Sequence, residues 1–128
     1  MKKKYKAMVL SCMDPRFQTP VYKFLKKKNL SGKYSLFTIA GAAVGVTHVK
    51  FRKWHNVFLD NLSTSIKLHE ITRLIVINHE DCGAVKIAEG KNNFKEEQIH
   101  KSSFLKLKKI VMKKFPKLKL EFHIMKLS

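Results

Sequence analysis

Hydrophobic positions along the chain follow patterns that predict alternating strands and helices. The run 74–78 is apolar up to its last residue, Asn78, and is rich in β-branched residues. This pattern is typical of a central strand in a parallel sheet that is covered on both faces. Shorter apolar or alternating runs at 6–11, 34–39 and 118–127 predict further strands.

Segments with helical spacing separate these strands. Thr19 is placed to cap a first helix that Pro20 would begin, because proline suits the first position of a helix. Apolar residues recur at helical spacing in two longer segments further along the chain. The predicted helices cover residues 20–28, 55–68, a short segment ending at 88, and 96–115, with loops at 47–53 and 90–93.

The alternation of strands and helices predicts an α/β fold, with a mostly parallel central sheet flanked by helices and right-handed crossovers. A chain of 128 residues is long enough for one hydrophobic core, so we expect a single domain, 1–128. The sequence contains no apolar run of about 18 residues or more, so no membrane span is predicted.

Composition adds an expectation about the cellular compartment. The basic residues 1–5 precede only a short apolar stretch without a small-residue cleavage site, so no secretory signal is predicted. We therefore expect a cytoplasmic protein. In a reducing compartment, Cys12 and Cys82 favour metal binding or catalysis over a disulfide.

The formal net charge of +18 raises the question of nucleic-acid binding, because clustered cations displace counterions from phosphates. Only Arg16, Arg52 and Arg73 of the 27 basic residues are arginine, the residue that contacts base edges and phosphates best. The lysines are spread along the whole chain. This distribution indicates solvated faces, so we expect no nucleic-acid partner.

Residues that are typical of functional sites follow the ends of three predicted strands. Cys12 follows the first strand, Ala40 and Gly41 follow the second, and His79 and Cys82 follow the third. Because ligands bind at the carboxyl ends of the strands in open α/β sheets, these residues are predicted to share one edge.

This set of residues predicts a zinc site. Zinc favours thiolate and imidazole ligands, and Cys12, His79 and Cys82 would leave one of four positions open, as in catalytic zinc sites. Asp14 and Arg16 follow Cys12 at two-residue steps and would share its side in an extended backbone. The alternatives are two small buried cysteines, a loop histidine and an ordinary turn carboxylate beside a surface arginine.

Two segments resemble known enzymes. Residues 11–16, Ser-Cys-Met-Asp-Pro-Arg, are similar to the C-x-D-x-R segment of the β-class carbonic anhydrases. Residues 79–84, His-Glu-Asp-Cys-Gly-Ala, are similar to the H-x-x-C-G-A segment of that family, and the Ala40-Gly41 step also matches. The resemblance covers roughly residues 7–88. The residues around the second motif resemble a compact carbonic-anhydrase-like subgroup more than the full-length enzymes.

The resemblance implies a β-carbonic-anhydrase-like fold and a zinc lyase that reversibly hydrates carbon dioxide to bicarbonate through zinc-bound hydroxide. It implies Cys12, His79 and Cys82 as zinc ligands, and Asp14 as a hydrogen-bond acceptor positioned by Arg16. In some members of the family the matching aspartate binds zinc instead. The resemblance also implies a pocket near Gly41 and Gly83, and a homodimer or a larger assembly.

Two other functions stay open at the level of sequence. The chain could be a non-catalytic protein that binds zinc for folding or for a partner. It could also be a zinc hydrolase of carbonyl sulfide or carbon disulfide. Ile39, where the family commonly has asparagine, leaves the substrate pocket in question.

The remaining candidate residues receive structural predictions. His48, His55, His69, His100 and His123 are expected at the surface or at helix caps, with Glu97 and His100 in a helix-surface contact. Phe51, Trp54 and Phe58 are expected in the core or a subunit interface. Glu80 and Asp81 are either acceptors behind the zinc ligands or solvated loop acids.

Overall fold

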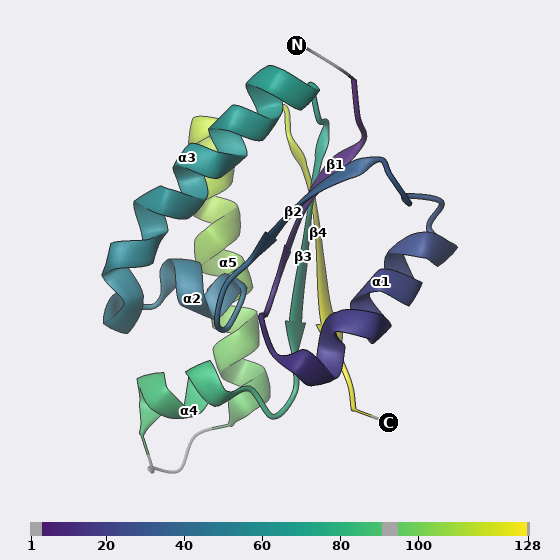
Figure 1. Cartoon of the computed structure of the whole chain (residues 1–128). Helices are drawn as coiled ribbons and strands as arrows, with labels where there is room; N and C mark the ends of the chain where they lie inside the picture. The colour runs from purple at the N-terminus through teal and green to yellow at the C-terminus, as the bar shows by residue number, and fades with distance from the viewer. Residues whose placement is uncertain (1–3, 91–94, 128) are drawn as a thin grey trace.

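The structure is a computed structural model that describes residues 4–90 and 95–127. Its four strands form one all-parallel sheet in the order β2-β1-β3-β4 (Figure 1), which confirms the predicted α/β fold. The elements in chain order are β1 (Ala7–Ser11), η1 (Pro15–Phe17), α1 (Gln18–Lys27), β2 (Tyr34–Thr38), α2 (Ala43–Thr47), η2 (Val49–Phe51), α3 (Arg52–His69), β3 (Arg73–His79), α4 (Gly83–Glu89), α5 (Glu96–Lys114) and β4 (Lys119–Met125).

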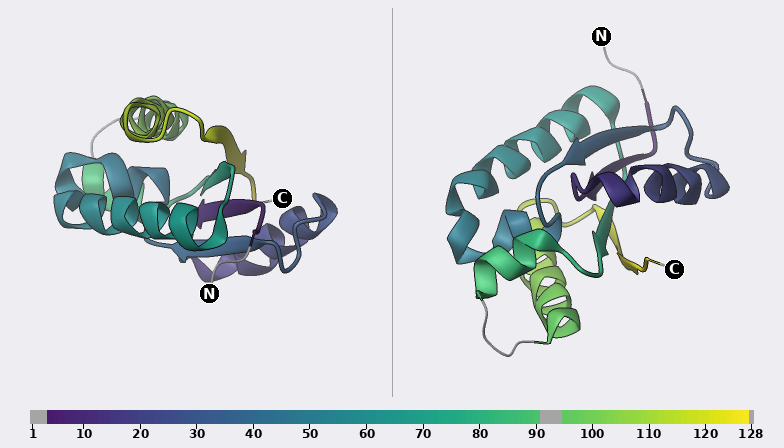
Figure 2. Two further views of the ribbon diagram at one scale, coloured as in Figure 1. Left: turned by 90° about the horizontal axis from the view of Figure 1, so that it is seen from above. Right: turned by 60° about the horizontal axis from the view of Figure 1, so that its bottom comes forward.

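The central strands β1 and β3 are buried on both faces, as their continuous apolar sequences predict. Alternate residues of these strands point to different cores. Val9 and Ile75 pack with Leu25 of α1 on one face, whereas Leu10 and Val76 pack on the other face with α2, α3 and α5. Figure 2 shows the sheet between these two layers of helices.

The first helical segment begins earlier than the sequence predicts. Asp14, rather than Thr19, caps it: the Asp14 carboxylate accepts the Arg16 backbone N–H at 2.9 Å. Pro15 is tolerated at the start of η1 because this position needs no N–H donor. α1 then starts at Gln18 and ends at Lys27.

The predicted loop at 47–53 is also wrong, because most of it is helical. It contains the last residue of α2, all of η2 and the first residues of α3. The His48 Nδ1 accepts the Lys50 N–H at 3.0 Å and so caps η2, which the polar composition of the segment did not reveal. The other predicted helices and strands agree with the structure to within about three residues at their ends.

Two further expectations concern the ends and the exterior of these elements. The predicted loop at 90–93 falls mostly outside the described residues. No helix among residues 4–90 and 95–127 is long and apolar enough to cross a membrane.

Candidate metal centre

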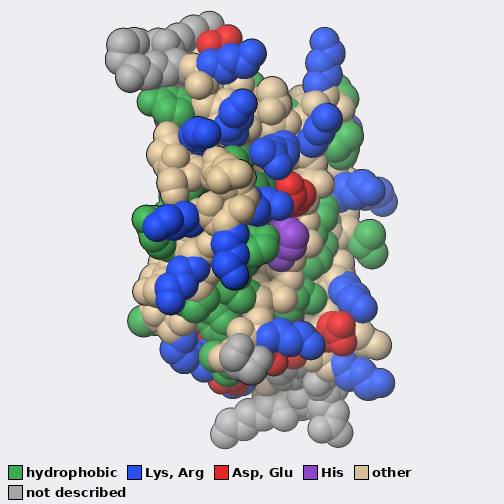
Figure 3. All heavy atoms as spheres, turned by 90° about the vertical axis from the view of Figure 1, so that its right-hand side faces the viewer, with side chains coloured by type: hydrophobic (Ala, Val, Ile, Leu, Met, Phe, Trp, Pro, Cys, Tyr) green, Lys and Arg blue, Asp and Glu red, His purple; other side chains and the backbone are tan. Residues whose placement is uncertain are grey.

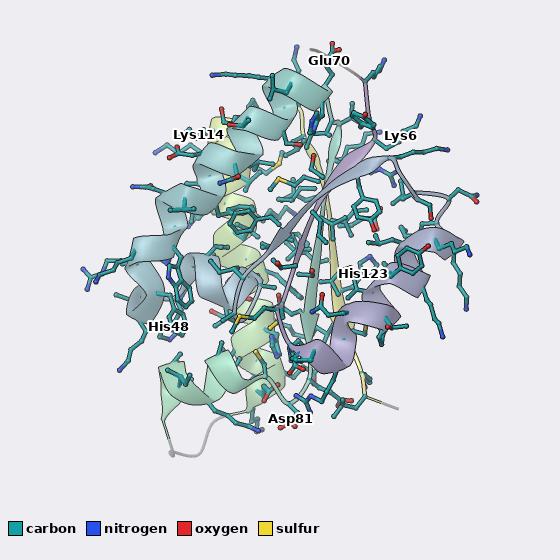
Figure 4. The ribbon with its side chains drawn as sticks, viewed as in Figure 1. Lys6, His48, Glu70, Asp81, Lys114 and His123 are labelled. Carbon is teal, nitrogen blue, oxygen red and sulfur yellow. The ribbon has the colours of Figure 1, made fainter. Side chains whose placement is uncertain are left out.

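The sheet brings the three predicted ligands together at its carboxyl edge. Cys12 directly follows β1, His79 is the last residue of β3, and Cys82 precedes α4. All three residues are buried, and one potential ligand atom from each lies within 4.8 Å of the others. Figure 4 labels Asp81, which lies between two of these ligands in sequence, at this end of the strands. The sequence prediction that these three residues meet is therefore confirmed.

His79 presents one nitrogen to this cluster. Its Nδ1 donates to the Glu80 carbonyl at 2.7 Å, and its ring stacks on Phe17 with centroids 4.1 Å apart. The Nε2 is buried and has no hydrogen-bond partner among the described residues. An unpaired buried nitrogen is costly, so this atom fits a metal ligand better than a structural histidine.

The side chains of the two cysteines are hydrogen-bonded to each other. The Cys82 thiol donates to Cys12, and this hydrogen bond lowers the pKa of Cys12 to about 4 and raises the pKa of Cys82. The Gly41 N–H also donates to the Cys12 sulfur at 3.3 Å. Zinc binds sulfur at about 2.3 Å and imidazole nitrogen at about 2.0–2.1 Å. The spacing and chemistry of these donors therefore fit one ion.

Asp14 pairs with Arg16, one of the two arrangements that the sequence left open, and the backbone that pairs them is not extended. Arg16 belongs to η1, and its Nη2 donates to Asp14 Oδ2 at 2.7 Å while its Nε donates to Oδ1 at 3.1 Å. These hydrogen bonds lower the pKa of Asp14 to about 2. The Asp14 Oδ2 lies 3.8 Å from His79 Nε2, so the carboxylate adjoins the ligand cluster while it remains bound to Arg16.

Asp81 completes this ion-pair network. The Arg16 Nη1 donates to Asp81 Oδ2 at 2.9 Å, and its Nη2 donates to the Asp81 carbonyl at 2.9 Å. Lys86 also pairs with the Asp81 carboxylate. Segment 79–82 is thereby tied to the segment that carries Cys12 and Asp14. Asp81 is thus an exposed loop carboxylate that accepts hydrogen bonds from Arg16.

The similarity of this chain to known proteins agrees with the geometry of the candidate metal centre. Residues 1–119 match the protein family described as "Putative carbonic anhydrase". The chain belongs to this family. An uncharacterized protein of Rickettsia bellii (strain RML369-C) is 30% identical over 125 residues, which are 94% of this chain and 76% of that protein. Uncharacterized protein RC0076 of Rickettsia conorii (strain ATCC VR-613 / Malish 7) is 27% identical over 125 residues, covering 94% of this chain and 67% of that protein.

A buried polar network, which the sequence did not predict, surrounds the candidate metal ligands. The Cys82 N–H donates to Glu96 Oε2 at 3.1 Å, and His100 Nε2 lies 3.1 Å from the same oxygen. His100 Nδ1 is hydrogen-bonded to Asn78 Nδ2 at 2.8 Å, and Asn78 Oδ1 accepts the Ala43 N–H at 3.0 Å. This network fixes the Cys82 loop against α5, β3 and α2.

The predicted surface position of His100 is therefore wrong. His100 is only 1% exposed, and it pairs with Glu96 rather than with Glu97. The i, i+4 spacing of Glu96 and His100 was available in the sequence. Their burial was not, because it results from packing α5 against the end of β3.

A cavity of about 540 Å³ opens beside the ligands of this carbonic-anhydrase-family chain. Gly83 lines it, as the pocket prediction requires. Gly41 does not appear among its lining residues and instead contacts the Cys12 sulfur. Phe58 is buried in the core as expected, whereas Phe51 and Trp54 line the cavity. The full lining is Cys12, Met13, Asp14, Pro15, Ala40, Phe51, Trp54, Gly83, Ala84 and Ile87.

Proposed function

We propose that this chain is a zinc-dependent lyase that reversibly hydrates carbon dioxide to bicarbonate. Cys12, His79 and Cys82 would hold the zinc ion. The observation that carries the proposal is the buried, unpartnered Nε2 of His79 in a cluster whose donor atoms lie within 4.8 Å of one another. Membership of the carbonic anhydrase family supports the reaction type.

Zinc with one open position supplies Lewis-acid activation of water near neutral pH. The side chain beside that position is Asp14, a carboxylate at neutral pH whose pKa Arg16 lowers further, to about 2. Asp14 would therefore accept a hydrogen bond from the reacting water and orient it. It would not act as a general acid in this pH range.

Arg16 has a positioning role in this proposal. Its Nε, Nη1 and Nη2 all donate to Asp14 or Asp81. A guanidinium with these donors occupied is held in place and is poorly suited to binding an anionic substrate directly. Its function would be to keep Asp14 ionised and turned towards the ligands.

The test is zinc quantification combined with stopped-flow carbon dioxide hydration. We expect one zinc per chain, hydration far above the Cys82→Ala variant, and an Asp14→Asn variant that retains zinc but loses most of its hydration rate. One zinc per chain without hydration from about pH 6.5 to 9 would contradict the lyase. That result would favour a non-catalytic zinc protein or a hydrolase of carbonyl sulfide or carbon disulfide.

We also propose a homodimer or a multiple of it. Support comes from β2, an edge strand of the sheet that carries Leu36 with 54% of its surface exposed. An exposed apolar edge strand can pair with another chain. Light scattering on the purified protein should give at least twice the mass of 14.9 kDa, and a monomer at all accessible concentrations would refute the assembly.

A further inference from the structure

A second cavity lies between α2, α4 and α5, and among the described residues it shares none with the cavity at the candidate metal centre. Its volume is about 230 Å³, below the range of about 300–1,000 Å³ that is usual for sites of drug-sized ligands. Val44 and Ile99 contribute apolar surface to its lining, together with Ser103, which is only 5% exposed. The cavity therefore suits a small molecule.

Glu89 of α4 presents a negative charge to this cavity, and His48 holds it in position. The His48 Nδ1 accepts the Lys50 N–H at 3.0 Å, so the proton of the ring is on Nε2, which donates to Glu89 Oε2 at 2.7 Å. In Figure 4 the labelled His48 lies beside α4. The two side chains are only 18% and 28% exposed, which shields this hydrogen bond from water. The second oxygen of the carboxylate, Oε1, can still accept a hydrogen bond from a ligand.

Lys106 presents the opposite charge to the same cavity from α5. In the described part of the chain the ion-pair partner of Glu89 is His48 and not Lys106. Two opposite charges that line one cavity without pairing with each other leave space for a ligand that carries both charges. Ser102 lines the cavity from the same helix as Lys106, and its hydroxyl can donate or accept a hydrogen bond.

We propose that this cavity binds a small zwitterion, an α-amino acid with a small apolar side chain. The ammonium group of the ligand donates to Glu89, and its carboxylate accepts from Lys106 and Ser102. The side chain of the ligand lies against Val44 and Ile99. Each charge of the ligand then has a charged partner, which offsets the hydration that it loses on binding. The site goes beyond the proposed function, because it requires neither the zinc ion nor the hydration reaction.

Three related probes separate the contributions of the two charges. L-Alanine carries both charges, N-acetyl-L-alanine lacks the ammonium group, and L-alaninamide lacks the carboxylate. Isothermal titration calorimetry on the zinc-loaded protein should show saturable binding of L-alanine. We expect the affinity of each of the other two probes to be lower by about tenfold or more, because each loses a hydrogen bond between charged groups.

Two pairs of variants test the charges of the protein. Glu89→Gln removes the negative charge but keeps an oxygen for His48, and its control is Glu97→Gln, at a carboxylate of α5 that is 71% exposed. Lys106→Gln removes the positive charge, and its control is Lys108→Gln on the same helix, at a residue that does not line this cavity. We expect the first variant of each pair to weaken L-alanine binding by about tenfold or more, and each control to leave it within about twofold.

Amino acids also bind metal ions directly, so the experiment has to distinguish this cavity from the metal centre. Binding that persists in Glu89→Gln and Lys106→Gln but is lost in Cys82→Ala would place L-alanine on the zinc ion and overturn the proposal. Equal affinity for L-alanine and either derivative would indicate a site for a single charge and would overturn it as well. The same holds for the absence of saturable L-alanine binding in folded protein that carries one zinc per chain.

Discussion

At the scale of single residues, Gly41 fixes the position of the candidate ligand Cys12. Its backbone has φ of +82°, and its N–H donates to the Cys12 sulfur. A Cβ at this position would lie 2.9 Å from the Ala84 Cβ and 3.1 Å from the Gly45 nitrogen. Only glycine satisfies both the left-handed backbone and the close approach of the α4 segment.

This geometry predicts the effect of Gly41→Ala. Left-handed strain costs about 1 kcal/mol, and overpacking against Ala84 adds about 1–3 kcal/mol. We expect a lower free energy of unfolding in urea and weaker zinc binding in competition with a chelator. Gly32→Ala is the matched control, because Gly32 has a similar φ of +72° with nothing within 4 Å of its Cβ position. Equal losses in the two variants would show that close packing at Gly41 is unimportant.

At the scale of secondary-structure elements, α5 holds the Cys82 segment in place. Glu96 accepts the Cys82 N–H and lies within 3.1 Å of His100, which is buried beneath it. A short loop with few apolar contacts depends on such hydrogen bonds for its order. The ligand Cys82 is thus oriented by a helix that begins 14 residues later in the sequence.

Replacing Glu96 with alanine should release this loop. The Cys82 N–H and the His100 ring would lose their partner, which costs about 1–3 kcal/mol for a buried donor. We expect reduced stability in urea and weaker zinc binding. Glu97→Ala serves as the control because the Glu97 side chain is 71% exposed and pairs with Lys101 on the surface of the helix. Zinc affinity that is the same in both variants would contradict the role of α5.

A second contact between elements involves Glu121 of β4, which lies 3.1 Å from both Arg73 of β3 and Lys28 at the end of α1. Burial alone would raise the pKa of Glu121, but hydrogen bonds from His123, Lys28 and Arg73 outweigh it. The pKa of this carboxyl is therefore below its usual value of 4.5. Its depressed pKa means that the ionised form stabilises the fold.

The pH dependence of this contact has a defined sign. The stabilisation by Glu121 is complete above its unfolded pKa of 4.5 and is lost as the pH falls through the lower folded value. Glu121→Gln should therefore lower the free energy of unfolding by about 1 kcal/mol at pH 7, and its difference from wild type should shrink in more acidic buffer. A difference that is constant from neutral to acidic pH would assign the effect to packing.

At the scale of the whole molecule, the metal centre joins elements that are distant in sequence. Its ligands come from the ends of β1 and β3 and from the start of α4. An ion bound there would link the central strands to α4, so its binding free energy would add to the stability of the fold. The rest of the domain is held by two separate apolar cores.

Zinc removal should therefore destabilise the chain without unfolding it. We expect a chelator to lower the Tm by several degrees, and added zinc to restore it. Far-ultraviolet circular dichroism at room temperature should remain that of a folded α/β protein, because the apolar cores persist. An unchanged Tm in protein that has been shown to have lost its zinc would mean that the metal does not contribute to the stability of the fold.

The distribution of charge belongs to the same scale. Figure 3 shows lysine and arginine side chains scattered over the face that carries α1 and β4, with apolar surface between them. On this face the basic side chains are spread out and do not gather in one patch. We continue to expect no specific nucleic-acid partner; a steep salt dependence of association with DNA would be the contrary observation.

The sequence by itself determined the α/β fold and the identity of the candidate metal ligands. The apolar, β-branched run in β3 is typical of a buried strand, and His79 at its end lies three residues before Cys82. The sequence also placed Asp14 and Arg16 close together, because they are local in sequence, but it left open whether Asp14 pairs with Arg16 or binds the metal. Local patterns are readable in this way since they depend on neighbouring residues alone.

Only the tertiary structure decided what surrounds these ligands. The burial of His100, the contact of Arg16 with Asp81 and the cavity beside Trp54 each join segments separated by tens of residues. The spacing of apolar residues along the sequence does not predict such contacts, because they arise when α3, α4 and α5 pack around the carboxyl edge of the sheet. The sequence therefore specified which residues can bind a metal, and the packing of the helices determined the space and charge that a ligand would meet there.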